Sequence, residues 1–292
     1  MKLCTFEINN KSKLGIIRDK AVIDLSIIDP KFNTDMKTLF DNWEILKTEL
    51  EQISNKNIQN YSIDEVRVKA PINNPQKFLA MGLNYHKHIE EVRERGVQVS
   101  DYQLWFNKQV SCINGPFDNI EIPIVSDQLD YEVELAMVIG KKSRHLDIEE
   151  AKNSIAGFMI CNDVSVRDWQ FRTQTLTLGK SFDTHGPIGP YIVTPDEIGD
   201  PHNLKIECKV NNEIRQSANT NDLLYSCYDL LVYLSKVMTL MPGDIISSGT
   251  PSGVGVAMQP QSFLKVNDKV KCTIENIGYL ENMVVKEKLI NH

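Results

Sequence analysis

The chain has 292 residues, 41% of them hydrophobic and 24% charged, and its 32 basic against 39 acidic side chains give a net charge of −7. This average composition excludes a mainly disordered chain, and 15 glycines with 12 prolines are too few for a collagen-like or low-complexity protein. The acidic balance argues against a surface built to bind nucleic acid or anionic lipid, although a local basic groove could still bind a small anion.

The first 70 residues predict a small N-terminal α/β domain. Short alternating segments predict strands over residues 3–8, 14–18 and 21–24, and the segment 36–53 predicts a helix. The Asn-rich run 55–62 fits a connecting loop. We therefore divide the chain into a domain of residues 1–70 and a larger domain of residues 71–292.

After residue 71, short apolar strands alternate with turns rich in glycine, proline and asparagine. The predicted strands cover residues 132–139, 157–162, 191–194, 204–210, 244–248 and 270–274. A helix is predicted over 147–156, where Asp147 and Glu150 form a capping-box-like start, and another over 223–241, ended by Pro242 and Gly243. The pattern predicts an α+β fold that is mainly β, with a mixed sheet and peripheral helices.

No segment predicts export or a membrane span. The first residues lack the apolar core and cleavage site of a secretory signal. The most apolar long stretch contains Asp229 and Lys236 and therefore predicts an amphipathic helix, not a membrane span. The six cysteines are scattered without a CxxC pair, which predicts free thiols packed as small hydrophobes. We expect a cytoplasmic protein with no nucleic acid or membrane partner.

Two acids mark the strand predicted at 132–139. Residues two apart on a strand share a face, so Glu132 and Glu134 project together while Val133 and Leu135 point the other way. Two neighbouring carboxylates repel each other unless a cation lies between them, and carboxylate oxygens suit Mg²⁺, Mn²⁺ or Ca²⁺. The alternative is an ordinary half-exposed strand with a solvated face.

A third acid favours the metal site. The apolar strand at 157–162 ends in a polar cluster that begins with Asp163, the position at which a ligand is commonly presented. Three such ligands leave coordination positions open for the carboxylate and keto oxygens of a 2-oxo acid. For Arg167 and Asp168, a local ion pair that fixes the turn is as good an interpretation as a role in chemistry.

His88 and Glu91 lie three residues apart in a short predicted helix ended by Gly96, so they share one face of it. A carboxylate that hydrogen-bonds an imidazole fixes its tautomer and raises its basicity, which suits a His that takes a proton from water. His86 would point elsewhere. These residues alone favour an ordinary exposed pair.

Five segments together resemble the fumarylacetoacetate hydrolase family, and they occur in the family's order. They are GLNYHKHIEE (82–91), DYEVELAMVIGK (130–141), NDVSVRDWQ (162–170), GKSFDTHGPIGP (179–190) and PGDIISSGTPSGVG (242–255), and the resemblance covers residues 78–285. It implies a mixed β-sheet roll as the catalytic domain and usually a homodimer. The acid pair with a single later Asp resembles the smaller acylpyruvate hydrolase and oxaloacetate decarboxylase branch.

The resemblance also implies roles for single residues at the metal. Glu132, Glu134 and Asp163 match the ligands of Mg²⁺ or Mn²⁺. His88 and Glu91 match a base on a lid that closes over the metal, which reverses the preference for an ordinary exposed pair.

Four further positions are predicted to contact substrate, three of them because they match such residues in the family. Lys180 matches a lysine that neutralises the negative charge of an enolate, although a surface lysine is the alternative. Gln170 matches a glutamine that hydrogen-bonds the substrate, and we place Arg167 beside it as a substrate-binding residue. Thr250, with the backbone N–H groups around it, matches a site for a substrate carboxylate, and a plain tight turn is the alternative.

Two positions depart from the family pattern. Gln109 stands where many relatives have Pro, and His185 stands where Phe is frequent, so both could alter substrate choice. We interpret His185 as a packed loop residue because Mg²⁺-type sites prefer oxygen donors. Arg93 and Arg95 could recognise a distal substrate carboxylate, but arginines on an exposed helix are usually solvated.

These residues lead to three hypotheses of function. The first is a Mg²⁺- or Mn²⁺-dependent hydrolase that cleaves a carbon–carbon bond in a small 2-oxo acid of the acylpyruvate or fumarylpyruvate type. The second is an oxaloacetate decarboxylase or 2-oxo acid tautomerase on the same metal, since neither reaction requires an attacking water. The third is a non-catalytic metabolite-binding protein, which the three acids together with His88, Glu91 and Lys180 disfavour.

Overall fold

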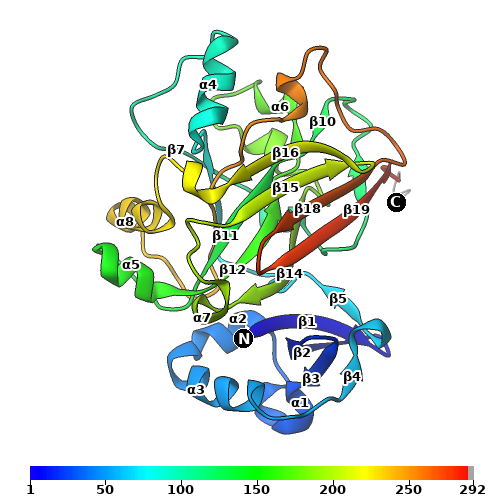
Figure 1. Cartoon of the computed structure of the whole chain (residues 1–292), viewed down its shortest axis with the longest axis vertical. Helices are drawn as coiled ribbons and strands as arrows, with labels where there is room; N and C mark the ends of the chain where they lie inside the picture. The colour runs from blue at the N-terminus through cyan, green and yellow to red at the C-terminus, as the bar shows by residue number, and fades with distance from the viewer. Residues whose placement is uncertain (289–292) are drawn as a thin grey trace.

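Strands dominate the structure, a computed structural model that describes residues 1–288 (Figure 1). The N-terminal region contains β1 (Lys2–Ile8), β2 (Lys11–Arg18), β3 (Ala21–Asp24), α1 (Leu25–Ile28), α2 (Met36–Asp41), α3 (Trp43–Ser54), β4 (Tyr61–Ser62) and β5 (Arg67–Lys69). The remaining strands are β6 (Phe78–Gly82), β7 (Leu104–Asn107), β8 (Ile113–Asn114), β9 (Ile120–Ile122), β10 (Leu129–Asp130), β11 (Val133–Ile139), β12 (Ile155–Asn162), β13 (Ser165–Val166), β14 (Gly186–Val193), β15 (Lys205–Val210), β16 (Glu213–Asn219), β17 (Ile245–Ser247), β18 (Lys269–Ile274) and β19 (Gly278–Lys286). The helices among them are α4 (His86–Glu94), α5 (Ile148–Ser154), α6 (Arg167–Gln170), α7 (Pro195–Ile198), α8 (Cys227–Val237) and the short 3₁₀ helix η4 (Thr177–Lys180).

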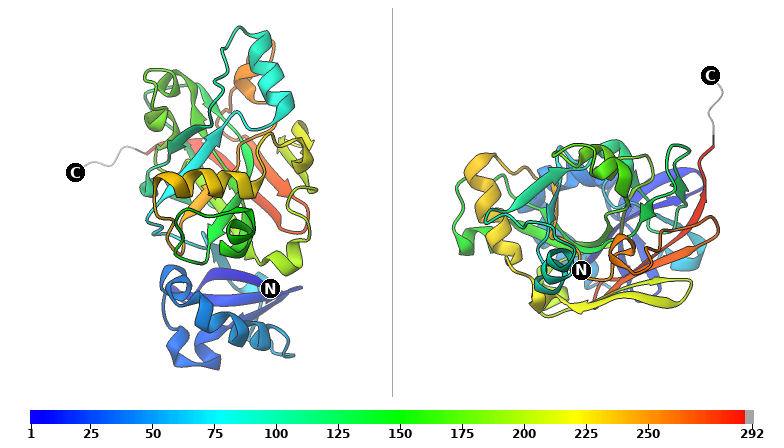
Figure 2. Two further views of the ribbon diagram at one scale, coloured as in Figure 1. Left: turned by 90° about the vertical axis from the view of Figure 1, so that its left-hand side faces the viewer. Right: turned by 90° about the horizontal axis from the view of Figure 1, so that it is seen from above.

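The strands form two larger sheets and one small one. The largest has the order β4-β3-β2-β1-β14-β12-β11-β17-β6-β7, with β5 on β1 and β8 on β14, and the second has the order β16-β15-β18-β19-β9. Most neighbours are antiparallel, but three pairs are parallel, namely β17 with β6, β19 with β9 and β14 with β8. Seen from above, the strands curl into a roll (Figure 2). The predicted mainly β, α+β fold with mixed sheets is confirmed.

The N-terminal region lies at one end of the molecule and α4 at the other (Figures 1 and 2). It is joined to the larger part by its first strand, because β1 pairs with β14. The boundary at residue 70 stays a prediction. The helix expected over 36–53 is divided, because Asn42 leaves the helical conformation and its side chain donates to the carbonyl of Thr38.

The predictions of the two other helices differ in accuracy. Helix α5 begins as expected, with reciprocal capping bonds between Asp147 and Glu150. Helix α8 is shorter than the predicted 223–241, because Ser226 and Asp229 form a capping box there and start the helix at Cys227. The preceding backbone N–H groups, including that of Leu224, instead bind Asn84 near the start of α4.

Strand β11 is buried on both faces. Leu135 and Met137 pack in the core between the two larger sheets, whereas Ala136 and Val138 pack in the core shared with the N-terminal region. Alternate side chains therefore reach different cores, as the period of a strand requires. The solvated strand face considered from the sequence is wrong, because every residue of β11 is buried.

Two further sequence predictions concern the cysteines and membrane-spanning helices. All six cysteines are free and buried, as expected for packed thiols. Among residues 1–288, no helix combines the length and apolar character needed to cross a membrane.

Candidate active site

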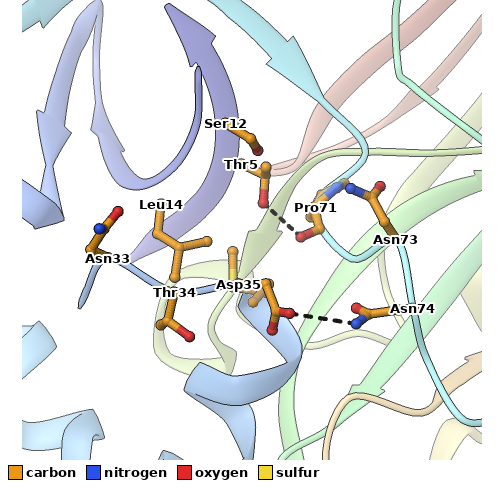
Figure 3. Close-up of a pocket in the computed structure, with 10 residues that line it drawn as sticks. Thr5, Ser12, Leu14, Asn33, Thr34, Asp35, Pro71, Asn73 and Asn74 are labelled. Atoms are coloured by element: carbon orange, nitrogen blue, oxygen red, sulfur yellow. Dashed lines mark hydrogen bonds between the residues drawn. The ribbon is translucent and has the colours of Figure 1, made fainter. Parts of the chain in front are cut away.

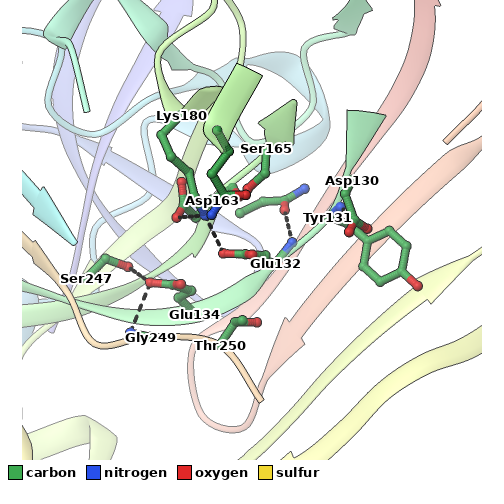
Figure 4. A network of polar contacts seen from close by, with 12 residues as sticks. Asp130, Tyr131, Glu132, Glu134, Asp163, Ser165, Lys180, Ser247, Gly249 and Thr250 are labelled. Atoms are coloured by element: carbon green, nitrogen blue, oxygen red, sulfur yellow. Dashed lines mark hydrogen bonds and ion pairs between the residues drawn. The ribbon is translucent and has the colours of Figure 1, made fainter. Parts of the chain in front are cut away.

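Three carboxylates meet where β11 and β12 lie side by side. Glu132 precedes β11, Glu134 lies on it, and Asp163 follows β12, whose Asn162 is paired with Val133. One carboxylate oxygen from each acid lies within 4.8 Å of those of the other two (Figure 4). All three side chains are buried, and the antiparallel pairing of β11 with β12 brings Asp163 to two acids that precede it by 31 and 29 residues in the sequence.

Two buried lysines contact this cluster. The Nζ of Lys180, at the end of η4, lies 2.6 Å from an oxygen of Glu132 and 2.7 Å from one of Asp163. The Nζ of Lys108 lies 2.7 Å from the other oxygen of Asp163 and also donates to the backbone carbonyl of Lys180. The alternative of Lys180 as a surface lysine is therefore wrong. Sequence reasoning missed Lys108, whose only signal is a charge directly after the apolar segment that forms β7.

Arg167 completes the cationic side of the cluster. Its Nε lies 2.8 Å from Asp130 and its Nη1 lies 2.6 Å from Glu132. Its Nη1 also donates to the side-chain oxygen of Gln170. The local Arg167–Asp168 ion pair considered from the sequence does not form, because Asp168 pairs with Arg172 instead. The buried Nη2 of Arg167 has no hydrogen-bond partner within the described residues 1–288 and is therefore a spare donor.

The two glutamates differ in electrostatics although they share one face. Burial raises the pKa of Glu132, but Lys180 and Arg167 outweigh burial and hold that pKa below its usual range. Burial together with Asp163 and Glu132 raises the pKa of Glu134 well above its usual range. The Glu134 carboxylate accepts from backbone N–H and hydroxyl donors rather than from a cation. It is therefore the acid whose negative charge the protein itself compensates least.

The donor set fits a hard divalent cation. Four buried carboxylates face three buried cations, namely Asp130, Glu132, Glu134 and Asp163 against Lys108, Arg167 and Lys180. All-oxygen ligands are typical of Mg²⁺ and Mn²⁺ sites, and a divalent ion would relieve the repulsion that raises the pKa of Glu134. Glu132, Glu134 and Asp163 would hold such an ion.

The predicted His–Glu pair lies on α4. The Nδ1 of His88 lies 2.7 Å from Glu91, and the second oxygen of Glu91 accepts from the backbone N–H of Gly253 at 2.9 Å. His88 is only 7% exposed, whereas His86 is exposed, so the two side chains diverge as expected. Gly96 has a φ of +80° and ends the helix as predicted. The ordinary exposed pair is the wrong interpretation.

The loop 249–256 uses its backbone N–H groups to bind the protein's own acids. Gly249 donates to Glu134, Gly253 to Glu91, and both Gly255 and Val256 donate to Asp130. Sequence reasoning missed Asp130, the fully buried residue whose two carboxylate oxygens thereby tie the loop to Arg167.

The residues predicted to contact substrate lie around this loop and cluster. The Thr250 hydroxyl donates to the carbonyl of Val133 and accepts from Gln216, so its proton is already engaged. Gln170 is buried against Arg167, and both line the same cavity as Thr250. Their role in substrate binding stays a prediction.

A cavity of about 380 Å³ contains these side chains. Seven of the nine predicted site residues line it together, namely His88, Glu132, Glu134, Arg167, Gln170, Lys180 and Thr250. The other two contact lining residues, because Asp163 accepts from Lys180 and Glu91 is hydrogen-bonded to His88. The outer wall is mainly apolar and is formed by Val92, Val97, Leu104, Phe106, Val254 and Val256.

The two departures from the family pattern lie outside this cavity. His185 is fully buried, and its Nε2 lies 2.8 Å from the carbonyl of Glu121, which agrees with a packed loop residue. Gln109 is exposed, and its backbone N–H donates to Ser181. Neither lines the cavity of the acid cluster.

A second cavity, of about 440 Å³, separates the N-terminal region from the segment 71–74 (Figure 3). Its one acid, Asp35, caps α2 by accepting from the backbone N–H of Thr38 and also lies 3.5 Å from Asn74. Thr5 donates to the carbonyl of Pro71. None of the predicted site residues lines this cavity.

A β roll that carries a buried acid cluster, two lysines and a His–Glu pair around one cavity defines a metal-dependent enzyme of small-molecule metabolism. Residues 77–285 match the model of the fumarylacetoacetate (FAA) hydrolase C-terminal family, and the chain belongs to that family. The resemblance drawn from the five sequence segments is confirmed.

Similar proteins cover nearly the whole chain. It is 42% identical over 266 residues to the oxaloacetate tautomerase Fahd2a, mitochondrial, of Rattus norvegicus, an alignment that covers 91% of this chain and 84% of that protein. Over 97% of both chains it is 38% identical to the fumarylacetoacetate hydrolase domain-containing protein 2 homolog of Dictyostelium discoideum.

Solved structures are similar over the full length. The maleylpyruvate hydrolase of Sphingobium sp. SYK-6, in complex with manganese(II) and pyruvate, has a TM-score of 0.81 at 29% identity and covers 99% of this chain and 100% of that one. The fumarylacetoacetate hydrolase of Exiguobacterium antarcticum has a TM-score of 0.83 at 34% identity and covers 98% of this chain and 100% of that one.

The expected cytoplasmic location is corrected by these comparisons. The rat relative and its bovine and human counterparts, 41–42% identical to this chain, all carry the designation mitochondrial. The expectation rested on the missing secretory pattern and the missing membrane span, and neither feature distinguishes one intracellular compartment from another.

Proposed function

We propose that this protein is a Mg²⁺- or Mn²⁺-dependent tautomerase that interconverts the keto and enol forms of oxaloacetate. The observation that carries the proposal is the placement of a His–Glu pair and a buried lysine around one cavity beside three acids. Tautomerisation needs one group to exchange a proton at carbon and another to serve the oxygen. The names of the relatives at 40–42% identity support the choice of oxaloacetate.

In this proposal Glu132, Glu134 and Asp163 hold the divalent cation, which when bound polarises the 2-oxo group of the substrate. Glu91 accepts the Nδ1–H of His88 and thereby leaves the Nε2 lone pair free to take a proton from C3. Lys180 stabilises the negative charge that develops on the C2 oxygen and delivers a proton to it from Nζ.

The proton balance closes through solvent. His88 gains one proton and Lys180 loses one when the enol forms, and exchange with water restores both groups. The opposite direction uses the same two atoms in reverse. The carboxylates of Glu132 and Asp163 both accept from the Nζ of Lys180 and hold it in place beside the proposed metal ligands.

Hydrolysis of a carbon–carbon bond in an acylpyruvate-type substrate is the second candidate. The observation that favours it is the His88–Glu91 pair, because an imidazole oriented by a carboxylate also takes a proton from water. The similarity to maleylpyruvate hydrolase supports it. Decarboxylation of oxaloacetate uses the same polarised oxo group without an attacking water.

One assay separates the candidates. Purified protein with Mg²⁺ or Mn²⁺ is mixed with oxaloacetate, and the keto and enol forms are followed by ¹H NMR while CO₂ release is measured; acetylpyruvate and fumarylpyruvate are tested in parallel. We expect metal-dependent interconversion of the oxaloacetate forms that a chelator stops. Cleavage of the acylpyruvates without tautomerisation would instead establish the hydrolase. Absence of metal-dependent turnover of all three substrates would refute both candidates.

We also propose that the protein is a homodimer, as the family resemblance implies. Sedimentation velocity at several protein concentrations tests this directly. A monomeric boundary over the full concentration range would contradict the dimer.

A further inference from the structure

Arg95 differs from the other cations of the main cavity. Arg167 and Lys180 are held between buried acids, whereas Arg95 forms no ion pair within residues 1–288. Arg95 also lines the cavity. Because it has no ion-pair partner among residues 1–288, its positive charge is available to a ligand in that cavity. An uncompensated guanidinium beside a substrate cavity is suited to a carboxylate, which it can bind in a bidentate manner.

The position of Arg95 is defined by its surroundings. It follows the last residue of α4, and the chain then turns at Gly96, where φ is +80°. Its Nη1 donates to the backbone carbonyl of Val256, another residue that lines the cavity. A guanidinium carries five N–H donors, so this single contact orients the group and leaves most donors available.

The wall around Arg95 is apolar. Val92 and Val97 flank it on its own segment, and Val254 and Val256 face it from the loop 249–256. The Arg95 side chain is itself exposed, as is that of Val97, so the guanidinium is accessible to a ligand that enters the cavity. The cations that line the cavity are thus of two kinds. Arg167 and Lys180 are paired with buried acids, whereas Arg95 lies beside apolar side chains and forms no ion pair among residues 1–288.

We propose that Arg95 binds a second, distal carboxylate and makes the protein selective for 2-oxo dicarboxylic acids over monocarboxylic acids of the same length. The inference rests on the proposed function for the identity of the 2-oxo end, which lies at the acid cluster. A purely structural role is the competing explanation, since the contact with Val256 also holds the end of α4 against the loop.

Equilibrium binding to matched ligands tests this selectivity without requiring turnover. Calorimetric titration of the Mg²⁺-supplemented protein compares 2-oxoadipate with 2-oxohexanoate and 2-oxoglutarate with 2-oxopentanoate. Within each pair the carbon number is equal and only the distal carboxylate differs. We expect the dicarboxylate to bind more tightly in at least one pair, with Arg95→Gln reducing that preference about tenfold or more. Arg95→Lys should keep part of it.

Arg93→Gln provides the matched control, because Arg93 is an exposed arginine of the same helix that does not line the cavity. It should leave the preference unchanged. If Arg95→Gln weakened both members of a pair equally, Arg95 would be a structural contact and the proposal would be overturned. The same holds if the wild-type protein showed no preference or bound none of the four acids.

Binding and turnover then separate the two proposals. A preference that depends on Arg95 in a protein without oxaloacetate turnover would overturn the proposed function and leave the role of Arg95 standing. If the protein tautomerises oxaloacetate but Arg95→Gln leaves the preference unchanged, the proposed function would stand and the role of Arg95 would be overturned. If the protein is active, a kinetic ratio should follow the binding preference. The kcat/KM for oxaloacetate divided by the kcat/KM for C3 hydrogen exchange in 2-oxobutanoate should be lower in Arg95→Gln than in the wild type.

Discussion

The floor and the mouth of the cavity are built on different principles. The floor, formed by the acid cluster with Lys108, Arg167 and Lys180, is buried and cross-linked by ion pairs between distant strands. The mouth, formed by α4 and residues 95–104, is largely exposed and is joined to the loop 249–256 through Glu91 and Arg95. A rigid floor suits chemistry that needs fixed geometry, and a loosely held mouth suits adaptation to the substrate.

The largest effect should come from the floor. Glu134→Gln keeps an oxygen that accepts from Ser247 and Gly249, so the fold should survive, but it removes one anionic metal ligand. We expect lost metal content by mass spectrometry and a fall in kcat/KM of about 10³-fold or more. Glu90→Gln, an exposed change on α4, is the control. A variant with normal metal content and rate would show that the cluster is not the metal site.

The next effect concerns the base at the mouth. His88→Gln should lower kcat by about 10²- to 10⁴-fold, because the proton acceptor is lost, while metal content stays normal. His86→Gln, on the exposed side of the same helix, should behave as wild type. Equal activity of the two variants would remove His88 from the mechanism.

A smaller effect should come from the residue that joins floor and mouth. Asp130 accepts from Arg167 and from Gly255 and Val256, so Asp130→Asn should misplace both the guanidinium and the loop. We expect a loss of about 10- to 100-fold in kcat/KM, the range for residues that orient a metal site indirectly. Asp127→Asn, nearby and exposed, is the control. An unchanged KM and kcat in Asp130→Asn would mean that floor and mouth are independent.

The smallest effect concerns stability and not activity. Burial lowers the pKa of His185 to about 3, so between pH 6.5 and 3 the unfolded chain binds a proton there that the folded protein does not. Stability should therefore fall as the pH falls through this window, by up to about 1.4 kcal/mol per pH unit. His185→Phe should reduce that slope in urea unfolding at pH 7 and 5.5. His145→Gln, an exposed change, should keep it.

Local patterns in the sequence predicted a large part of the site. The alternation that puts Glu132 and Glu134 on one face, and the spacing that puts His88 beside Glu91, both follow from the geometry of a single element. In the same way, the capping pair of Asp147 and Glu150 predicted where α5 begins. Each of these predictions needed only residues within one helix or strand.

Other parts of the site depend on contacts between distant segments. Lys108 reaches Asp163 across 55 residues and Arg167 reaches Asp130 across 37, and no local pattern encodes either pairing. The local alternative for Arg167, a pair with Asp168, was wrong for this reason. The loop 249–256 looked free to bind a substrate, because its sequence does not reveal that three acids of the protein already occupy its N–H groups.

By itself the sequence determined the family, the mainly β class, and most of the chemically important residue types in their order along the chain. The tertiary structure decided which charges compensate one another, because strand pairing and burial bring acids and cations together and exclude water from between them. It thereby left Glu134 as the least compensated acid of the floor and Arg95 as a cation of the mouth that forms no ion pair in the described part of the chain.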